Sequence, residues 1–323
     1  MKAVLIRRHG GPEVLEIADL PRPKAEAGQV VIQVKAAGMN HLDTWVRRGM
    51  PGVTLPLPMI PGCDASGIVA EVGAGVAGVA PGDRIFVSPG TSCGRCDACL
   101  SGQEPLCKEY RLIGEHQNGT QAEFVALPAA NVLPLPASLS FEEGAAFPLV
   151  FLTAWHMLVA RAGVRLGDDV LVHAAGSGVG SAAVQIARLH GARVIATVGS
   201  SAKADKARAL GADETIDYKT KDFLEEVRRL TGKRGVDIVF DSIGQETWEK
   251  NLKALARGGR LVNCGAILGS TMGSRAELLR LAGLMGERRL RPVIDRVLPL
   301  EKVAEGHRAM ADRALFGKVV LTP

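Results

Sequence analysis

Four cysteines lie close together in the chain with the spacing of a metal-binding loop. The pattern is C-x2-C-x2-C-x7-C, formed by Cys93, Cys96, Cys99 and Cys107. Four thiolates this close can surround one zinc ion tetrahedrally and hold a segment that has little hydrophobic core of its own. Because the protein supplies all four ligands, no position stays open for a substrate, and we expect a structural zinc. Disulfides are the alternative. Pro89-Gly90 and Gly94 favour a loop over a helix here.

A glycine-rich turn is the second feature that could do chemistry. Residues 176–180 read Gly-Ser-Gly-Val-Gly, after an apolar run at 170–172 and before a helical pattern that Gly191 ends. A second strand is expected at 193–198. Strand, tight turn, helix and parallel strand form a βαβ unit whose turn and helix N-terminus can hold a pyrophosphate. The turn therefore predicts dinucleotide binding; an α/β crossover without a nucleotide is the alternative.

These motifs lie in two regions of different texture. Residues 1 to about 125 are β-rich and punctuated by glycine and proline, with strand-like runs at 30–34, 67–72 and 83–87. From Phe141 onward, helical patterns alternate with short apolar strands, which predicts a parallel doubly wound sheet. The further strands are expected at 214–216, 236–240 and 260–262, and the tail adds a helix at 300–311 and a strand at 317–321.

Length and composition limit the class of protein. A chain of 323 residues with 47% hydrophobic residues is long enough for two ordinary domains. The net charge of +5 is modest and spread along the chain, so no nucleic-acid partner is expected. No uncharged apolar stretch reaches the length of a membrane-spanning helix, and the start resembles a strand rather than a signal peptide. We expect no membrane association and a cytoplasmic location, where thiols stay reduced.

Together the two motifs resemble the medium-chain dehydrogenase/reductase family, the zinc alcohol dehydrogenases and their quinone oxidoreductase relatives. The cysteine segment is like that of the zinc alcohol dehydrogenases. Four other stretches look more like the NADPH-dependent quinone oxidoreductases, namely residues 37–45, 61–67, 152–155 and 196–200. The resemblance implies an α/β fold: a Rossmann doubly wound parallel sheet plus a GroES-like β-barrel domain, with the nicotinamide between them. It also suggests a homodimer or homotetramer.

The domain boundaries expected from this resemblance are specific. Residues 1–125 and 287–323 would form the GroES-like catalytic domain, with the zinc lobe at 88–110. Residues 126–286 would form the Rossmann domain.

The chain departs from the family's catalytic zinc site. The three positions that match the zinc ligands fall on Asn40, on Cys63 and near Leu149. Asparagine and leucine cannot replace thiolate ligands, so we expect no catalytic zinc. An improvised shell remains the alternative, built from His41, Cys63, Asp64 and Asp43.

Loss of that zinc would change the chemistry. Zinc polarises an alcohol or carbonyl oxygen, whereas quinones and enones accept hydride without it because charge spreads through conjugation. We therefore expect an oxidoreductase that moves hydride between a nicotinamide and a small-molecule carbonyl or conjugated acceptor. A zinc-type alcohol dehydrogenase and a non-catalytic NADPH-binding protein are the alternatives.

The resemblance implies that Asn40 polarises the substrate, Trp45 forms a wall of the nicotinamide pocket and Thr153 contacts the nicotinamide. Core packing is the alternative for Trp45. Asp43 is expected to be a structural hydrogen-bond partner.

The end of the second strand predicts which dinucleotide binds. Proteins that select NAD carry an acid there, whereas this chain has Gly199 and Ser200, and the first acid, Asp205, comes a helical turn later. Lys203 lies just beyond the turn and suits a 2′-phosphate. We expect NADP(H), with NAD(H) as the alternative. The resemblance adds further cofactor contacts at Ser177, Gly178, Val179, Gly180, Tyr218, Ser242, Gly265 and Arg313.

One connection in the chain is too short. The strand that ends at Cys264 is followed by a strand-like run at 267–269, with only Gly265 and Ala266 between them. A parallel connection needs a dozen residues or more. Either a segment is missing between Ala266 and Ile267, or the sheet lacks its sixth strand. We favour a missing segment, which predicts a Cα separation there far above ~3.8 Å.

Overall fold

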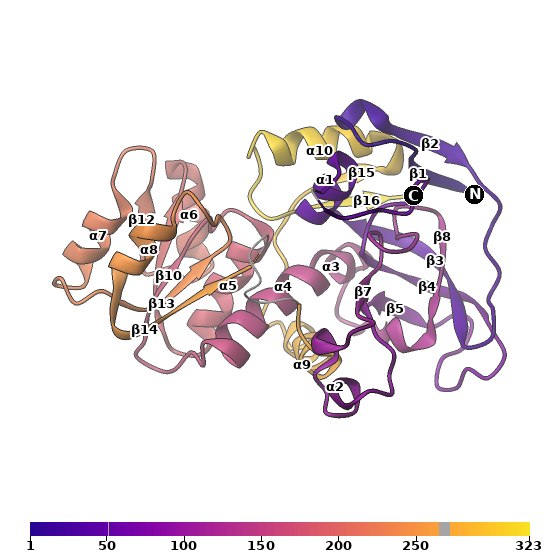
Figure 1. The fold of residues 1–323 in the computed structure, drawn as a ribbon, viewed down its shortest axis with the longest axis horizontal. Coiled ribbons are helices and arrows are strands. Elements are labelled where there is room, and N and C mark those ends of the chain that lie inside the picture. The colour runs from indigo at the N-terminus through magenta and orange to yellow at the C-terminus, as the bar shows by residue number, and fades with distance from the viewer. Residues whose placement is uncertain (51, 265–271) are drawn as a thin grey trace. The chain divides into compact units, whose positions relative to one another are not determined.

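The chain folds into two compact units in a computed structural model that describes residues 1–50, 52–264 and 272–323. The first unit combines Met1–Leu149 with Leu278–Pro323, and the second is Val150–Glu277. Figure 1 follows the chain through both. Each unit is described below by itself.

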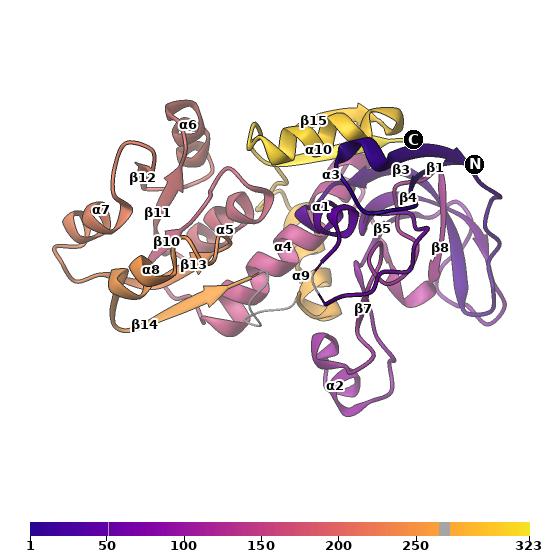
Figure 2. The ribbon, with the colours of Figure 1, turned by 45° about the horizontal axis from the view of Figure 1, so that its top comes forward.

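The first unit is built on a seven-stranded, mostly antiparallel sheet. Its order is β15-β16-β3-β4-β5-β9, with β8 paired to β3. The C-terminal strand β16 pairs with β3, so this sheet joins segments from early and late in the chain. Figures 1 and 2 show the C-terminal segment, in yellow, beside the N-terminal segment, in indigo. The strands are β3 (Gln29–Gly38), β4 (Asp64–Val72), β5 (Arg84–Val87), β8 (Phe124–Pro128), β9 (Val132–Pro134), β15 (Ile294–Pro299) and β16 (Lys318–Thr322).

Shorter elements surround this sheet. A separate hairpin pairs β1 with β2 antiparallel, and α1 and α10 lie near the chain ends. The remaining elements are β1 (Lys2–Ile6), η1 (Pro12–Val14), β2 (Leu15–Asp19), α1 (His41–Arg48), β6 (Gly90–Thr91), α2 (Asp97–Leu100), η2 (Glu104–Leu106), β7 (Arg111–Leu112), η3 (Ala129–Asn131), α3 (Phe141–Ala146), η5 (Leu300–Lys302) and α10 (Val303–Ala311).

The observed division differs from boundaries at 125/126 and 286/287. Strand β9 pairs with β5 and helix α3 packs on β3 and β4, so the chain up to Leu149 stays with the first sheet. At the other end, α9 (Arg275–Gly286) starts in the second unit and ends in the first. The boundaries therefore follow strand pairing and helix packing, and the change in sequence texture at Phe141 lies nearer the observed boundary than the one implied by the resemblance.

The second unit is a parallel five-stranded sheet of order β12-β11-β10-β13-β14. All four neighbouring pairs are parallel, which confirms the predicted doubly wound arrangement. The chain moves outward from β10 to β12 and then returns to β13, so the strand order reverses between β10 and β13. Ligands of such sheets bind at the carboxyl ends near that reversal. The strands are β10 (Asp169–Val172), β11 (Arg193–Val198), β12 (Glu214–Asp217), β13 (Val236–Asp241) and β14 (Leu255–Asn263).

Helices cross between these strands. Their apolar faces supply the core, for example Val227 of α7 against Ile195 and Val239 of the sheet. The connecting helices are α5 (Gly178–Leu189), α6 (Ser201–Ala209), α7 (Phe223–Leu230) and α8 (Trp248–Ala254). Before the first strand come α4 (Pro148–Trp155), which begins in the first unit, and the π-helix η4 (His156–Arg161).

The predicted break in the chain and the predicted cofactor contact at Gly265 are not tested by this fold. The junction between Ala266 and Ile267 lies outside the described residues, as does Gly265. Among the residues that are described, no helix is both long and apolar enough to cross a bilayer.

Acid should destabilise the first unit through His307 of α10. This side chain is fully buried, its Nδ1 accepts from Arg47 Nε at 3.3 Å, and burial together with the Arg47 charge lowers its pKa from 6.5 to about 3. The His307 imidazole is protonated near pH 6.5 in the unfolded chain but only near pH 3 in the folded chain. The free energy of unfolding therefore falls with decreasing pH in that window, by about 1.4 kcal/mol per pH unit.

We predict that His307→Gln lowers the slope of the free energy of unfolding against pH by the contribution of one proton, about 1.4 kcal/mol per pH unit. Urea unfolding at pH 8, 6 and 5 measures it, with His9→Gln at an exposed position as the control. An unchanged slope in His307→Gln would contradict the prediction.

Candidate functional site

The four-cysteine lobe brings its sulfur atoms together. The Sγ atoms all lie within 4.8 Å of one another, and three of their separations are 3.6, 3.6 and 3.9 Å. A zinc ion with Zn–S bonds of about 2.3 Å needs sulfurs roughly 3.8 Å apart, so the group fits one tetrahedral zinc. These separations exceed an S–S bond of about 2 Å, and all six cysteines are free thiols, which excludes the disulfide alternative.

The lobe is less loop-like than its glycines suggest. Helix α2 begins at Asp97, directly after Cys96, so Cys99 stands on one helical turn while Cys93 and Cys107 lie outside it. Figure 2 shows this part of the chain extending from the sheet of the first unit.

The glycine-rich turn of the second unit has the geometry of an anion site. Helix α5 begins directly after Ser177, whose Oγ accepts the N–H of Gly180 at 3.0 Å. A Cβ atom at Gly180 would lie 2.2 Å from the carbonyl oxygen of Ala174, so only glycine fits there. The first N–H groups of α5 lack partners within the helix, as in every helix, and Gly178 and Val179 are half-buried. A pyrophosphate fits this end of the helix.

The predicted adenosine contacts gather at the ends of β11 and β12. Ser200 caps α6 by accepting the N–H of Lys203 at 3.4 Å. The Tyr218 N–H donates to the carbonyl of Val198 at 3.1 Å, and its hydroxyl lies 2.6 Å from where a Cβ of Gly199 would stand. The Tyr218 side chain is exposed, so a ligand at this edge could reach it.

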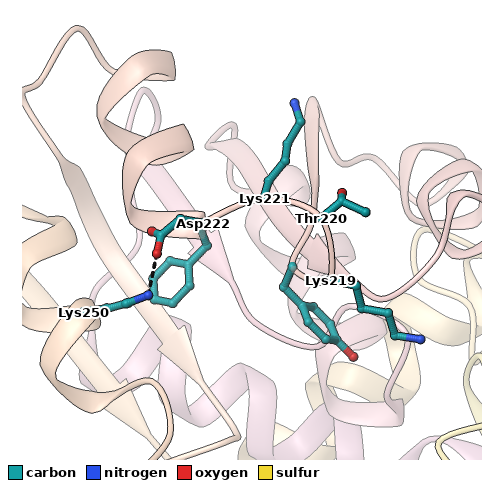
Figure 3. A pocket seen from close by; sticks show the side chains of 7 residues that line it. Lys219, Thr220, Lys221, Asp222 and Lys250 are labelled. Carbon is teal, nitrogen blue, oxygen red and sulfur yellow. Dashed lines mark hydrogen bonds and ion pairs between the residues drawn. The ribbon is translucent and has the colours of Figure 1, made fainter.

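A pocket of about 360 Å³ adjoins Tyr218 along the loop after β12. Figure 3 shows the Lys250 ammonium beside the Asp222 carboxylate, while Lys219 and Lys221 point away from that pair. Lys221 pairs with Glu226 at 3.3 Å. The edge beside the expected adenosine site is thus rich in lysine.

A buried carboxylate at the end of β13 forms a hydrogen-bond network that the sequence did not predict. Asp241 is fully buried, and its Oδ1 accepts from the Ile243 N–H at 2.8 Å and the Thr247 hydroxyl at 3.2 Å. Asn263 donates to Oδ2 at 3.0 Å, which ties the ends of β13 and β14 together. This network holds the turn that contains Ser242. An aspartate at a strand end followed by Gly244, with φ of 91°, is the signal that could have revealed it.

A second missed residue supports the glycine-rich turn from behind. His173 is buried, and its ring contacts the Thr197 hydroxyl at 3.2 Å and the Asn251 carbonyl oxygen at 2.7 Å. The Thr197 hydroxyl also accepts the Ala174 N–H at 3.1 Å. The network therefore fixes the start of the turn against β11 and α8, and burial lowers the pKa of His173.

Three other predicted site residues belong to other elements of the two units. Arg313 belongs to the first unit, just after α10, with φ of 52°. Thr153 lies on α4 in the second unit, where it is buried and its hydroxyl is directed toward Met272 Sδ at 3.8 Å. Trp45 is 42% exposed on α1, so the alternative that it packs in the core is wrong.

A buried polar cluster, defined as Asn40, Cys63, Asp64 and Lys318, lies in the first unit. Each of the four is at most 4% exposed. The Asn40 amide donates to Cys63 Sγ at 3.3 Å and to Asp64 Oδ2 at 2.9 Å, and its oxygen accepts from Lys318 Nζ. Lys318 Nζ also donates to Asp64 Oδ2 at 3.2 Å. Both ends of the Asn40 amide are therefore engaged within the protein.

The cluster joins the positions that match the family's catalytic zinc ligands. Besides Asn40 and Cys63, the third position contributes a backbone group, because Leu149 N–H donates to Asp64 Oδ1 at 2.9 Å. Leucine offers no ligand atom, and the ammonium of Lys318 lies where its charge would oppose a dication. Within the described ranges, only the four cysteines of the lobe gather as a metal-ligand group. These residues do not fit a catalytic zinc, and His41 belongs to no metal-ligand group among the described residues.

Asp43 borders this cluster as a hydrogen-bond partner. Its Oδ2 accepts the Asn40 N–H at 2.8 Å and the Gln121 amide at 3.2 Å. Its Oδ1 and the Gln121 Oε1 are buried without a partner among the described residues. Burial raises the pKa of Asp43 to about 7, so this carboxyl group is about half protonated at neutral pH.

Comparison with known proteins identifies the family of both parts of the chain. Residues 26–137 match the model for the alcohol dehydrogenase GroES-like domain, and residues 178–293 and 266–321 match models for zinc-binding dehydrogenases. A quinone oxidoreductase of Rattus norvegicus is 31% identical over 99% of this chain and 97% of its own length. The chain belongs to the medium-chain dehydrogenase/reductase family. It is therefore an oxidoreductase of the alcohol dehydrogenase and quinone oxidoreductase superfamily.

Members of both branches are similar to the chain. An alcohol dehydrogenase of Geobacillus stearothermophilus is 30% identical over 99% of both chains. A solved structure described as an NAD-dependent alcohol dehydrogenase is 53% identical over the full length of both chains, with a TM-score of 0.96. A cobalt- and zinc-bound alcohol dehydrogenase of Pyrobaculum aerophilum is 31% identical over 100% of this chain and 99% of that one, with a TM-score of 0.90.

Removal of one lobe thiolate should release the lobe's zinc. We predict that Cys96→Ser lowers zinc from one ion per chain toward none and makes the lobe at 88–110 more sensitive to protease, because three ligands hold the ion less tightly than four. NADPH binding should persist, since the glycine-rich turn lies in the other unit. Elemental analysis and limited proteolysis test this, with Cys264→Ser as the control. Equal zinc in both variants would refute the assignment of the lobe.

Proposed function

We propose that the chain is an NADPH-dependent reductase of conjugated carbonyl compounds, quinones or enones. The observation that carries the proposal is the buried polar cluster, in which an ammonium group stands among the positions that match zinc ligands. A site without a Lewis acid favours acceptors that delocalise charge themselves. The acceptor gains one hydride equivalent from the cofactor and one proton from the medium, so that a quinone becomes a hydroquinone and an enone gains the hydride on its β-carbon, and the cofactor leaves oxidised by two electrons.

Features of the second unit support binding of the pyrophosphate and ribose parts of the dinucleotide. Bound NADPH supplies a hydride from its nicotinamide ring. The N-terminus of α5 after Ser177 would hold the pyrophosphate, and the Asp241 network would fix the turn beside the ribose. Ser200 and Lys203 at the start of α6 support a 2′-phosphate. The first acid there, Asp205, is exposed and paired with Arg208 at 3.0 Å, so it does not stand where an NAD-selective acid would.

Zinc-dependent alcohol oxidation with NAD is the second candidate. The relative at 53% identity is described as an NAD-dependent alcohol dehydrogenase, and this favours the alternative. The buried polar cluster opposes it, because the ligand set for a second zinc is incomplete.

Paired assays separate the two functions. We predict that the purified protein reduces 1,2- and 1,4-quinones with NADPH and keeps that activity after treatment with a chelator that spares the lobe. Oxidation of simple primary and secondary alcohols should be slower by at least about 100-fold, the scale of one lost electrostatic stabiliser. Strong alcohol oxidation that disappears with chelation and returns with zinc would refute the proposal.

Lys203 should determine the preference for NADPH. We predict that Lys203→Ala lowers kcat/KM for NADPH by about 10- to 100-fold, the value of a charge-assisted hydrogen bond, and leaves NADH nearly unchanged. Lys206→Ala, one turn further along α6, is the matched control and should have little effect. If the wild type prefers NADH, or if both variants behave alike, the assigned role of Lys203 is wrong.

The quaternary state and location are proposed from the family alone. We propose a cytoplasmic homodimer or homotetramer acting on a small molecule. Light scattering after size-exclusion chromatography measures the mass of the assembly, and a monomer would contradict this part.

A further inference from the structure

Lys318 is a buried cation whose ammonium group donates to two buried side chains. It begins β16 and is 3% exposed. Its ammonium donates to the Asn40 oxygen and to Asp64 Oδ2, and the other Asp64 oxygen is held by the Leu149 N–H. Burial of an unpaired ammonium is costly, so such a residue persists only where its partners satisfy it.

Asp64 and Lys318 form one buried ion pair, and Asn40 bridges the pair to the start of α1. The thiol of Cys63 stays neutral, because burial and the nearby carboxylates raise its pKa. A divalent ion added to this arrangement would meet a fixed positive charge and no free thiolate.

The ammonium also engages the atoms that a metal would use. Asp64 Oδ2 is the one carboxylate oxygen shared by the Asn40 amide and Lys318, and its partner oxygen already accepts from Leu149. Cys63 Sγ accepts from the same Asn40 amide. A metal could bind here only after the Lys318 ammonium had moved out.

We propose that the ammonium of Lys318 occupies the place of a catalytic metal, excludes a metal ion from the buried polar cluster, and positions Asn40 and Asp64. Exclusion of metal rests on the cluster alone. The catalytic consequence rests on the proposed function. Lys318 is a positioning residue, since the contacts that define it are with Asn40 and Asp64 and not with a substrate.

Metal counting tests the exclusion without reference to activity. Asn40→Cys with Cys63→His supplies a thiolate and an imidazole beside Asp64, which makes three ligands. With Lys318 retained, this double variant should bind one cobalt(II) per chain, at the lobe. Addition of Lys318→Ala should raise the count to two, with a new visible spectrum from mixed sulfur, nitrogen and oxygen ligands. Equal counts in the double and triple variants, whether one or two, would overturn the proposal.

Two measurements check that these variants are folded. The lobe cobalt and NADPH binding both report structure away from the cluster, so a variant that keeps both is folded. A variant that loses either is replaced by its Lys318→Met counterpart, which restores apolar bulk at the same position.

Kinetics test the positioning role. Lys318→Met should lower kcat for quinone reduction by about 10- to 100-fold, with KM for NADPH changed less than about twofold. Lys318→Arg should recover most of the lost rate because it keeps the charge, and Lys2→Met, at an exposed ion pair with Glu301, should behave as wild type. An unchanged kcat in Lys318→Met overturns the positioning role. A wild type without quinone activity refutes the proposed function instead, while the metal counts still decide the exclusion.

Discussion

The ion pair between Lys318 and Asp64 is the constraint on which the first unit depends. It joins the first residue of the last strand, β16, to the first residue of β4, and through Asn40 it reaches the N-terminus of α1. Both partners are at most 3% exposed, so water cannot solvate either charge if the other partner is removed. Removal of one partner from such a pair costs about 3–5 kcal/mol, because the remaining charge stays buried. Loss of the Lys318–Asp64 pair would therefore destabilise the first unit, and the pair holds both side chains in fixed positions.

The chain separates two tasks that a zinc ion can perform. In the lobe, four thiolates can bind a metal that stabilises a segment with little core. In the buried polar cluster, a side-chain ammonium stands where a metal would act on a substrate. The separation explains how a chain can match models of zinc-binding dehydrogenases and still lack a complete ligand set for a second zinc.

Local patterns in the sequence predicted the parts of the fold that depend on local patterns. The strand expected at 193–198 is β11 with the same ends, and the glycine-rich turn lies between β10 and α5 as expected. The cysteine spacing predicted a group whose sulfurs do meet. These features were accessible because a turn, a strand or a short ligand loop is specified by residues close together in the chain.

The parts that were missed depend on contacts between distant residues. Lys318 was expected only as part of a terminal strand, yet its partner Asp64 lies 254 positions away. His173 and Asn251 are likewise 78 positions apart. Asn40 was expected to polarise a substrate, but both ends of its amide are already engaged, and only the folded chain reveals that. No periodicity or spacing encodes such pairs.

Anomalous X-ray scattering at the zinc edge, from crystals grown with zinc and NADPH, tests the central claim most directly. The account predicts one zinc peak per chain, at Cys93, Cys96, Cys99 and Cys107, and a Lys318 ammonium bonded to Asn40 and Asp64. A second peak beside Cys63, with Lys318 displaced from Asp64, would contradict it.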